Sequence, residues 1–182
     1  TAGFAMNANR GITLASSSNS TIEVATGETL SYAGVITGSG NLAKTGDGTL
    51  TLTGDSTNSG DVTVSAGTLA IDGSGSLYCD ANCGDATHTN NKAVVTVANG
   101  ATLSLADWGW AGGLGELYFD ADQLVIDGGT LQFTGTTATD TSVGNVGRGF
   151  TVTANGATFE SASAGEGWNL QRHTTAEYQP VF

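Results

Sequence analysis

The chain has 182 residues and a formal net charge of −12, with 17 acidic side chains against five Lys and Arg. So few basic residues cannot form a basic patch, which disfavours nucleic acid and anionic membranes as partners. A chain of this length is expected to form one domain. Glycine is present at roughly twice its usual share and proline occurs once, which favours short strands joined by tight turns.

No apolar run approaches the roughly 20 residues that a membrane helix needs, so we expect no membrane insertion by this segment. Residues 1–9 contain Phe4 and Met6 without a clear period, and we expect them to form an edge or cap segment. From residue 10 to residue 160, a strand, a glycine turn and a Thr-Leu or Thr-Phe strand recur six times. This recurrence predicts an all-β repeat protein.

The apolar residue that follows the threonine marks each copy of the repeat. Between consecutive copies the steps are 20, 19, 34, 28 and 28 residues. The shortest steps are too short for a βαβ unit but suit three short strands and three turns, which is one rung of a parallel β-solenoid. The marker residues are Leu30, Leu50, Leu69, Leu103, Leu131 and Phe159.

Within a rung, alternation predicts which side chains point inward. Leu50 and Leu52 lie two residues apart, as do Val62 and Val64, so each pair points to the same side of its strand. Threonines between them would face outward, and glycines at the corners would supply a positive φ without steric cost.

The long steps predict three insertions, near 72–93, 106–122 and 134–149. Each follows a Thr-Leu strand and precedes the next apolar strand. If every rung turns the same way, all three leave from one side of the solenoid, where insertions often build a binding surface. Residues 161–182 lose the pattern and are predicted to be a cap or tail of a single domain that spans residues 1–182.

A longer similarity connects the two ends of the chain. Residues 10–14 followed by Thr21-Ile22-Glu23 resemble residues 148–152 followed by Thr158-Phe159-Glu160. We therefore expect similar rungs at both ends. Such ends would permit head-to-tail self-association into a fibre, a heterologous contact that need not close.

Two stretches carry a resemblance to a known family. Residues 38–52 read Gly-Ser-Gly-Asn-Leu-Ala-Lys-Thr-Gly-Asp-Gly-Thr-Leu-Thr-Leu, and residues 62–69 read Val-Thr-Val-Ser-Ala-Gly-Thr-Leu. The segment Gly34–Ile71 thereby resembles the autotransporter-associated β-strand repeat of bacterial surface proteins. The resemblance implies a right-handed parallel β-helix passenger, extracellular or displayed on the bacterial outer cell surface, with roles in adhesion, aggregation or biofilm formation. It brings no shared catalytic residues.

Aromatic residues in the second insertion are the predicted ligand-binding residues. Trp108 and Trp110 lie in a glycine-rich stretch, and Tyr118 follows in the same segment. Rings of this kind can stack on sugar faces or anchor a protein partner. In the alternative interpretation, both tryptophans fold back and cover apolar surface on the side of the solenoid.

The insertions also hold the candidate disulfide and metal residues. Cys79 and Cys83 are interpreted as a local disulfide formed in an oxidising compartment, with two free thiols as the alternative. Asp120 and Asp122 can offer oxygen ligands to Ca²⁺, although a solvated acidic face is the simpler interpretation. We expect no other cofactor.

No catalytic residue is predicted, because nothing places a base beside a nucleophile. We expect a non-enzymatic adhesin segment, a β-helical stalk whose insertions bind a host or environmental glycan or a surface protein. The alternative is a carbohydrate-active enzyme, a glycoside hydrolase or lyase, on the same scaffold. A third hypothesis is an ice-binding face of ranked threonines, suggested by Thr-x-Thr at residues 49–53.

Overall fold

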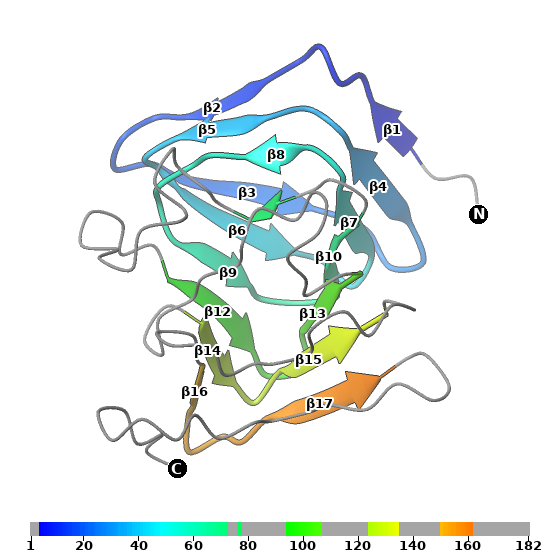
Figure 1. Ribbon diagram of the computed structural model, residues 1–182, viewed down its shortest axis with the longest axis vertical. Coiled ribbons are helices and arrows are strands. Elements are labelled where there is room, and N and C mark those ends of the chain that lie inside the picture. The colour runs from blue at the N-terminus through cyan, green and yellow to red at the C-terminus, as the bar shows by residue number, and fades with distance from the viewer. Residues whose placement is uncertain (1–3, 73–75, 78–93, 107–123, 135–149, 162–182) are drawn as a thin grey trace, which may run out of the picture.

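A computed structural model describes residues 4–72, 76–77, 94–106, 124–134 and 150–161. The described residues form strands and turns (Figure 1). They contain no helix that is long and apolar enough to span a membrane. The strands stack in parallel sheets along one axis, and the fold is a parallel β-helix, as the sequence predicts.

Three walls surround the axis of the described rungs. The seven-strand wall contains, in spatial order, β1 (Phe4–Met6), β4 (Thr29–Tyr32), β7 (Thr49–Leu52), β10 (Thr68–Ile71), β13 (Thr102–Leu105), β15 (Thr130–Phe133) and β17 (Thr158–Ser161). The six-strand wall contains β3 (Asn19–Glu23), β6 (Asn41–Thr45), β9 (Val62–Val64), β12 (Val95–Ala98), β14 (Leu124–Asp127) and β16 (Thr151–Val152). The third wall consists of two strand pairs, β2 (Ile12–Leu14) with β5 (Ile36–Gly38) and β8 (Asp55–Ser56) with β11 (Ser76–Leu77).

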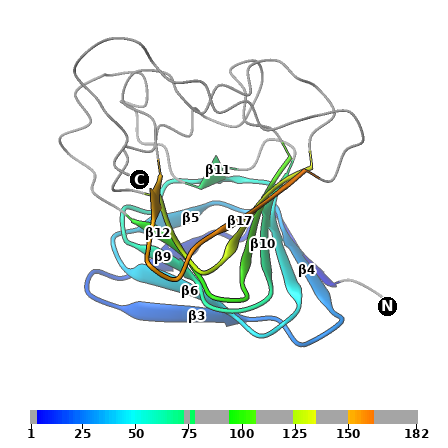
Figure 2. The same cartoon turned by 90° about the horizontal axis from the view of Figure 1, so that it is seen from below.

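Each rung runs from the six-strand wall to the seven-strand wall and then to the third wall. Figure 2 looks along the axis from below, and the path from β3 through β4 to β5 is counter-clockwise. Successive rungs approach the viewer in this view, because the chain descends from β1 to β17 in Figure 1. The coil is therefore right-handed.

The strand register follows the marker residues of the repeat. Each marker residue is paired with its equivalent in the next rung, so residues that are 19 to 34 positions apart in sequence become neighbours. The long steps do not disturb this register, because strands on both sides of them pair in phase. The paired series is Leu30, Leu50, Leu69, Leu103, Leu131 and Phe159.

Glycine occupies the corner between the six-strand and seven-strand walls in every described rung. All six corner glycines have φ between 62° and 82°, a region that L side chains rarely adopt. The prediction that corner glycines supply positive φ is thus confirmed. They are Gly27, Gly46, Gly67, Gly100, Gly128 and Gly156.

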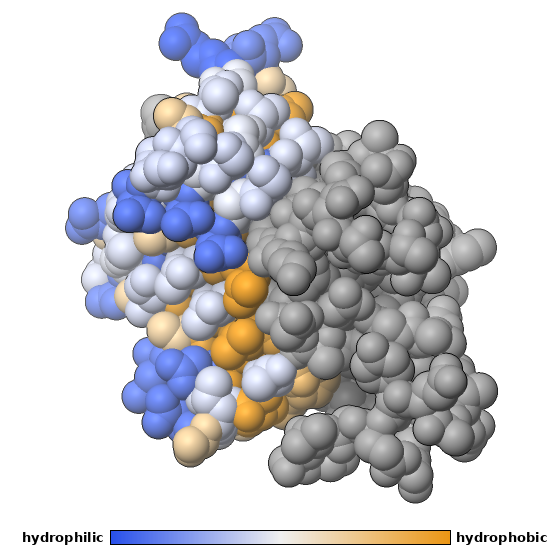
Figure 3. Space-filling model, turned by 90° about the vertical axis from the view of Figure 1, so that its left-hand side faces the viewer, coloured by the Kyte–Doolittle hydropathy of each residue, from blue (hydrophilic) through white to orange (hydrophobic). Residues whose placement is uncertain are grey.

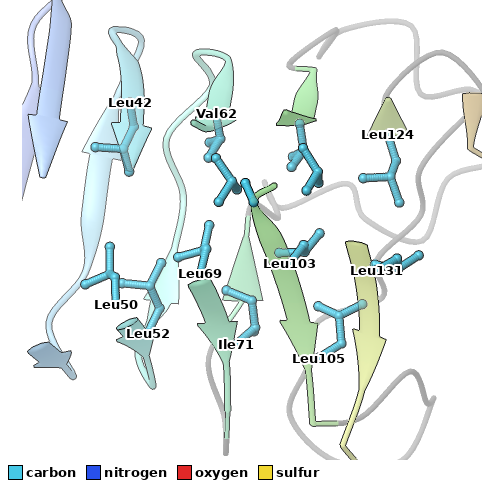
Figure 4. Packing of buried hydrophobic residues seen from close by; sticks show 14 of the residues in the cluster. Leu42, Leu50, Leu52, Val62, Leu69, Ile71, Leu103, Leu105, Leu124 and Leu131 are labelled. Carbon is cyan, nitrogen blue, oxygen red and sulfur yellow. The ribbon is translucent and has the colours of Figure 1, made fainter. Parts of the chain in front are cut away.

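Aliphatic side chains fill the interior of the tube (Figure 4). Leu50 and Leu69 on one wall point toward Leu42 and Val62 on the other, and all four are buried. Burying one such side chain fully is worth about 1.5–3 kcal/mol. Since no rung can bury its apolar face alone, this stabilisation accumulates by stacking.

The expected similarity between the two ends of the chain is wrong in structural terms. Residues 12–14 belong to the third wall, whereas residues 151–152 belong to the six-strand wall. Residues 21–23 and 158–160 likewise lie in different walls. The similarity reflects the general alternation of apolar and threonine residues in strands, which does not distinguish one wall from another.

Candidate binding edge

The three predicted insertions begin at equivalent positions of their rungs, although the first, near 72–93, still contains β11 (Ser76–Leu77) of the third wall. The residues at their starts, Asp72, Ala106 and Thr134, directly follow strands of the seven-strand wall. Their N–H groups donate to the carbonyl of the last residue of the preceding strand in that wall, at 3.0, 3.0 and 2.9 Å. The three exit positions are therefore stacked one rung apart.

The chain returns at equivalent positions as well, at Val94, Leu124 and Phe150. These residues begin, or directly precede, strands of the six-strand wall. Exit and return positions both border the side that the third wall closes in the earlier rungs. We call this border, formed by residues 72, 106 and 134 and by residues 94, 124 and 150, the insertion edge.

A ladder of polar side chains supports the first return position. The Asn41 amide donates to Asn19 Oδ1 at 3.0 Å, and Asn41 Oδ1 accepts from Asp61 N at 3.0 Å. Asp61 Oδ1 in turn accepts from Val94 N at 2.9 Å. Hydrogen bonds of this kind contribute about 0.5–1.5 kcal/mol each. The ladder carries the register of the early rungs across the long step that ends at Val94.

Lower on the same flank, the last return position packs through aromatic contact. The rings of Phe150 and Phe159 lie with centroids 5.2 Å apart and planes tilted by 49°, a favourable geometry for an aromatic pair. In Figure 3, apolar residues on this flank gather toward the lower rungs, while hydrophilic residues lie along the opposite margin. The first return position of the insertion edge is thus held by polar side chains, and the last return position is held by apolar side chains.

The predicted site residues themselves lie outside the described residues. The structure therefore places the ends of the insertions and leaves the aromatic, disulfide and calcium assignments as predictions. Within the described ranges, no three His, Cys, Asp or Glu side chains come together as metal ligands would. The residues concerned are Trp108, Trp110, Tyr118, Asp120, Asp122, Cys79 and Cys83.

Asp127 is an acidic residue near the predicted calcium site, and the structure describes it. It ends β14 at the corner opposite the insertion edge. Its Oδ1 accepts hydrogen bonds from Thr153 Oγ1 at 2.5 Å and from Asn155 Nδ2 at 2.8 Å. These two donors hold the Asp127 pKa below its usual value. Asp127 therefore stabilises the corner turn of the next rung.

The tube contains a buried charge that was not predicted from the sequence. Lys44 lies on β6 at an inward position, in register with Val64, and its side chain is 0 % exposed. Its Nζ donates to the carbonyls of Thr45 at 2.9 Å, Gly46 at 2.7 Å and Ala66 at 3.1 Å. Three donors thus meet three acceptors, and the ammonium joins the corner turns of two successive rungs.

Burial lowers the pKa of Lys44, and the nearby Asp47 carboxylate opposes this shift only in part. The alternation of side chains along β6 could have indicated that Lys44 is buried. Leu42 and Lys44 are two residues apart, so they must face the same side. An inward lysine at that position needs carbonyl partners, and the adjoining corner provides them.

Tyr32 has a similar role in the preceding rung. Its ring is buried, and its hydroxyl donates to Arg10 O at 2.5 Å, with Val35 O at 3.3 Å. Burial raises the Tyr32 pKa, partly offset by a backbone hydrogen bond at Ile12. Tyr32 and Lys44 each satisfy backbone carbonyls at a corner, which buried polar groups require.

The threonines of the seven-strand wall form a single column. They are paired from rung to rung and lie beside a mixed column that contains Ser31, Thr51 and Ala70. Among the described strands, the two-column Thr-x-Thr array suggested by residues 49–53 therefore occurs in only one rung. The column members are Thr29, Thr49, Thr68, Thr102, Thr130 and Thr158.

Comparison with known protein families supports the resemblance seen in the sequence. The family model of the passenger-associated-transport-repeat matches residues 42–71, which run from β6 to the end of β10. This segment includes Lys44, Gly46 and Gly67, the elements of the packed corner. The resemblance to an autotransporter passenger repeat is thereby confirmed over these residues. No curated protein and no solved structure matches the chain.

Proposed function

We propose, starting from the passenger repeat at residues 42–71, that the chain is a non-enzymatic segment of a secreted or cell-surface passenger. In this proposal the β-helix is a stalk, and its insertions bind a glycan or a surface protein. The formal net charge of −12 supports partners other than nucleic acid. The proposed location is extracellular, on the bacterial outer surface.

The observation that carries this proposal is the common border of the three insertions. Their exit positions stack through hydrogen bonds of 2.9 to 3.0 Å, and their return positions lie on one wall. Segments held at rung spacing on one side can present a continuous surface, as loops on a rigid scaffold commonly do. Trp108 and Trp110 are the proposed contacts within it.

Binding to a glycan array and to a panel of surface proteins tests the proposal. We expect the variant Trp108→Ala/Trp110→Ala to lose most of the binding seen with wild type, because aromatic anchors dominate such interfaces. The matched control is Thr26→Ala, an exposed substitution at the corner opposite the insertion edge. Equal binding by wild type and the double variant would remove the aromatic contacts from the proposal.

The same panel distinguishes the enzyme alternative. A glycoside hydrolase would release reducing sugar and would need two carboxyl groups placed across the scissile bond. We expect binding without release of reducing sugar. Release that survives purification and disappears on substitution of Asp120 or Asp122 would favour the enzyme instead.

Self-association is a second element of the proposed function. Among the described strands, β1, β2 and β3 present free edges at one end of the tube, and β16 and β17 do so at the other. Edges of the same two parallel sheets can pair head to tail between copies. Light scattering should show mass that rises with protein concentration. A strict monomer at high concentration would count against self-association.

A further inference from the structure

The pentapeptide Ala-Asn-Gly-Ala-Thr occurs twice, at residues 98–102 and 154–158. Both copies form the corner between the six-strand and seven-strand walls, from β12 to β13 and from β16 to β17. The chain therefore contains one short sequence in two structural settings. Among dipeptides that begin with asparagine, asparagine followed by glycine is chemically the most labile. Glycine has no side chain to shield its backbone nitrogen from the asparagine side chain.

In the first copy the reactive groups are exposed and are not held by hydrogen bonds among the described residues. Asn99 and Gly100 are both exposed, and Gly100 has a φ of 77°. The turn is closed by Ala101 N donating to Ala98 O at 2.9 Å, which leaves the Gly100 N–H in the outer peptide of the turn. No hydrogen bond between described residues involves the Asn99 amide or the Gly100 N–H.

In the second copy the same groups are held. Gly156 N donates to Thr153 O at 3.0 Å, so the nitrogen that would react is engaged. Asn155 Nδ2 donates to Asp127 Oδ1 at 2.8 Å, and Asn155 N donates to Thr153 Oγ1 at 3.2 Å. The Asp127 carboxylate also disfavours negative charge on the neighbouring backbone nitrogen.

We propose that Asn99 is a site of spontaneous covalent modification and that Asn155 is protected from it. The Gly100 nitrogen attacks Asn99 Cγ, a C–N bond forms, and the bond to the amide nitrogen breaks. The amide nitrogen leaves as ammonia with the proton lost by Gly100, and a cyclic imide remains. Water then opens either carbonyl of the imide, which gives aspartate or isoaspartate.

The product changes the corner in two ways. Isoaspartate lengthens the main chain by one carbon between β12 and β13, and either product adds a negative charge. Asn99 also lies against the next corner, since a Cβ placed on Gly128 would approach Asn99 Cβ to 3.1 Å. The modification therefore acts on the stacking of two rungs that border the insertion edge.

Peptide mapping by mass spectrometry after incubation of the native chain in mildly alkaline buffer tests this inference. We expect Asn99 to convert about tenfold faster than Asn155, which corresponds to about 1.4 kcal/mol in activation free energy. In denaturant the two identical pentapeptides should convert at similar rates, which controls for sequence. Asn99→Gln should abolish conversion at the first copy, and Asp127→Ala should accelerate it at the second.

Three results would overturn the inference. Native rates that are equal at the two sites would show that the hydrogen bonds do not protect Asn155. A faster Asn155 would reverse the assignment. Lack of native conversion at Asn99, over a time in which the denatured chain converts fully, would show that the turn at Asn99 is as protected as the turn at Asn155.

Discussion

The corners at Gly46 and Gly100 perform the same turn between the same two walls, yet they differ in packing. Both glycines have positive φ, at 70° and 77°. A Cβ on Gly46 would overlap the Val24 carbonyl oxygen, and the Lys44 ammonium binds the corner from inside. A Cβ on Gly100 would meet nothing within 4 Å. Glycine is thus needed for backbone conformation at both corners and for space at only one.

The largest expected difference comes from alanine at the two corners. Gly100→Ala should cost about 1–2 kcal/mol, the strain of a left-handed L residue. Gly46→Ala should cost about 2–5 kcal/mol, because overpacking adds about 1–3 kcal/mol to that strain. Urea unfolding followed by circular dichroism measures both. Equal losses would show that the Gly46 corner relaxes freely.

Removal of the Lys44 ammonium tests what holds the packed corner. Lys44→Ala should destabilise by about 2–4 kcal/mol, since it leaves a cavity as well as unpaired carbonyls. Lys44→Met keeps most of the volume and should cost about 1–2 kcal/mol. Ser65→Ala, an exposed corner substitution, should stay within about 0.5 kcal/mol. The idea fails if Lys44→Met is as stable as wild type in the same unfolding experiment.

The pH dependence of stability tests the lowered pKa of Lys44. Its pKa is lowered from the usual value of 10.5, so between the two values the unfolded chain binds more protons than the folded one. The free energy of unfolding should therefore rise with pH across that window. Wild type compared with Lys44→Met isolates this contribution, because the other groups titrate in both. A difference that stays flat, or falls with pH, would contradict a lowered pKa.

The smallest effect is expected at the C-terminal corner. The Asp127 pKa is lowered from 3.8, so its stabilisation is present above that value and is lost as pH falls through the lower folded value. Asp127→Asn should remove this acid-dependent contribution and leave neutral-pH stability less affected than the corner substitutions do. Acid titrations of wild type and variant, monitored by fluorescence, should then diverge at neutral pH and converge at low pH.

The rungs were predictable because their register depends on local patterns that repeat. Alternation decides which way Leu50 and Leu52 face, and Gly67 must turn the chain wherever it occurs. The short strand at Phe4–Met6 was harder, since three residues carry no period. It becomes a strand only by pairing with β4, which lies more than 20 residues away in sequence.

The candidate site was predictable only in its outline. The step lengths indicated that three segments lie between the same two strands of a rung. Ile71, Leu105 and Phe133 do end equivalent strands, but after Ile71 the chain first adds β11 to the third wall. The buried positions of Lys44 and Tyr32 were not predicted, because the sequence alone suggests a surface position for a lysine or a tyrosine in a strand. Tyr32 shows the reason, since its hydroxyl partner Arg10 O belongs to another rung.

The amino-acid sequence by itself determined the coil, the phase of its rungs and the positions of its corners, because these depend on period and on backbone freedom at single residues. The tertiary structure alone decided which corners are packed and which are open. That distinction depends on carbonyls and ammonium groups brought together from different rungs, such as Lys44 with Ala66. Only stacking makes such residues neighbours, and no local pattern records it.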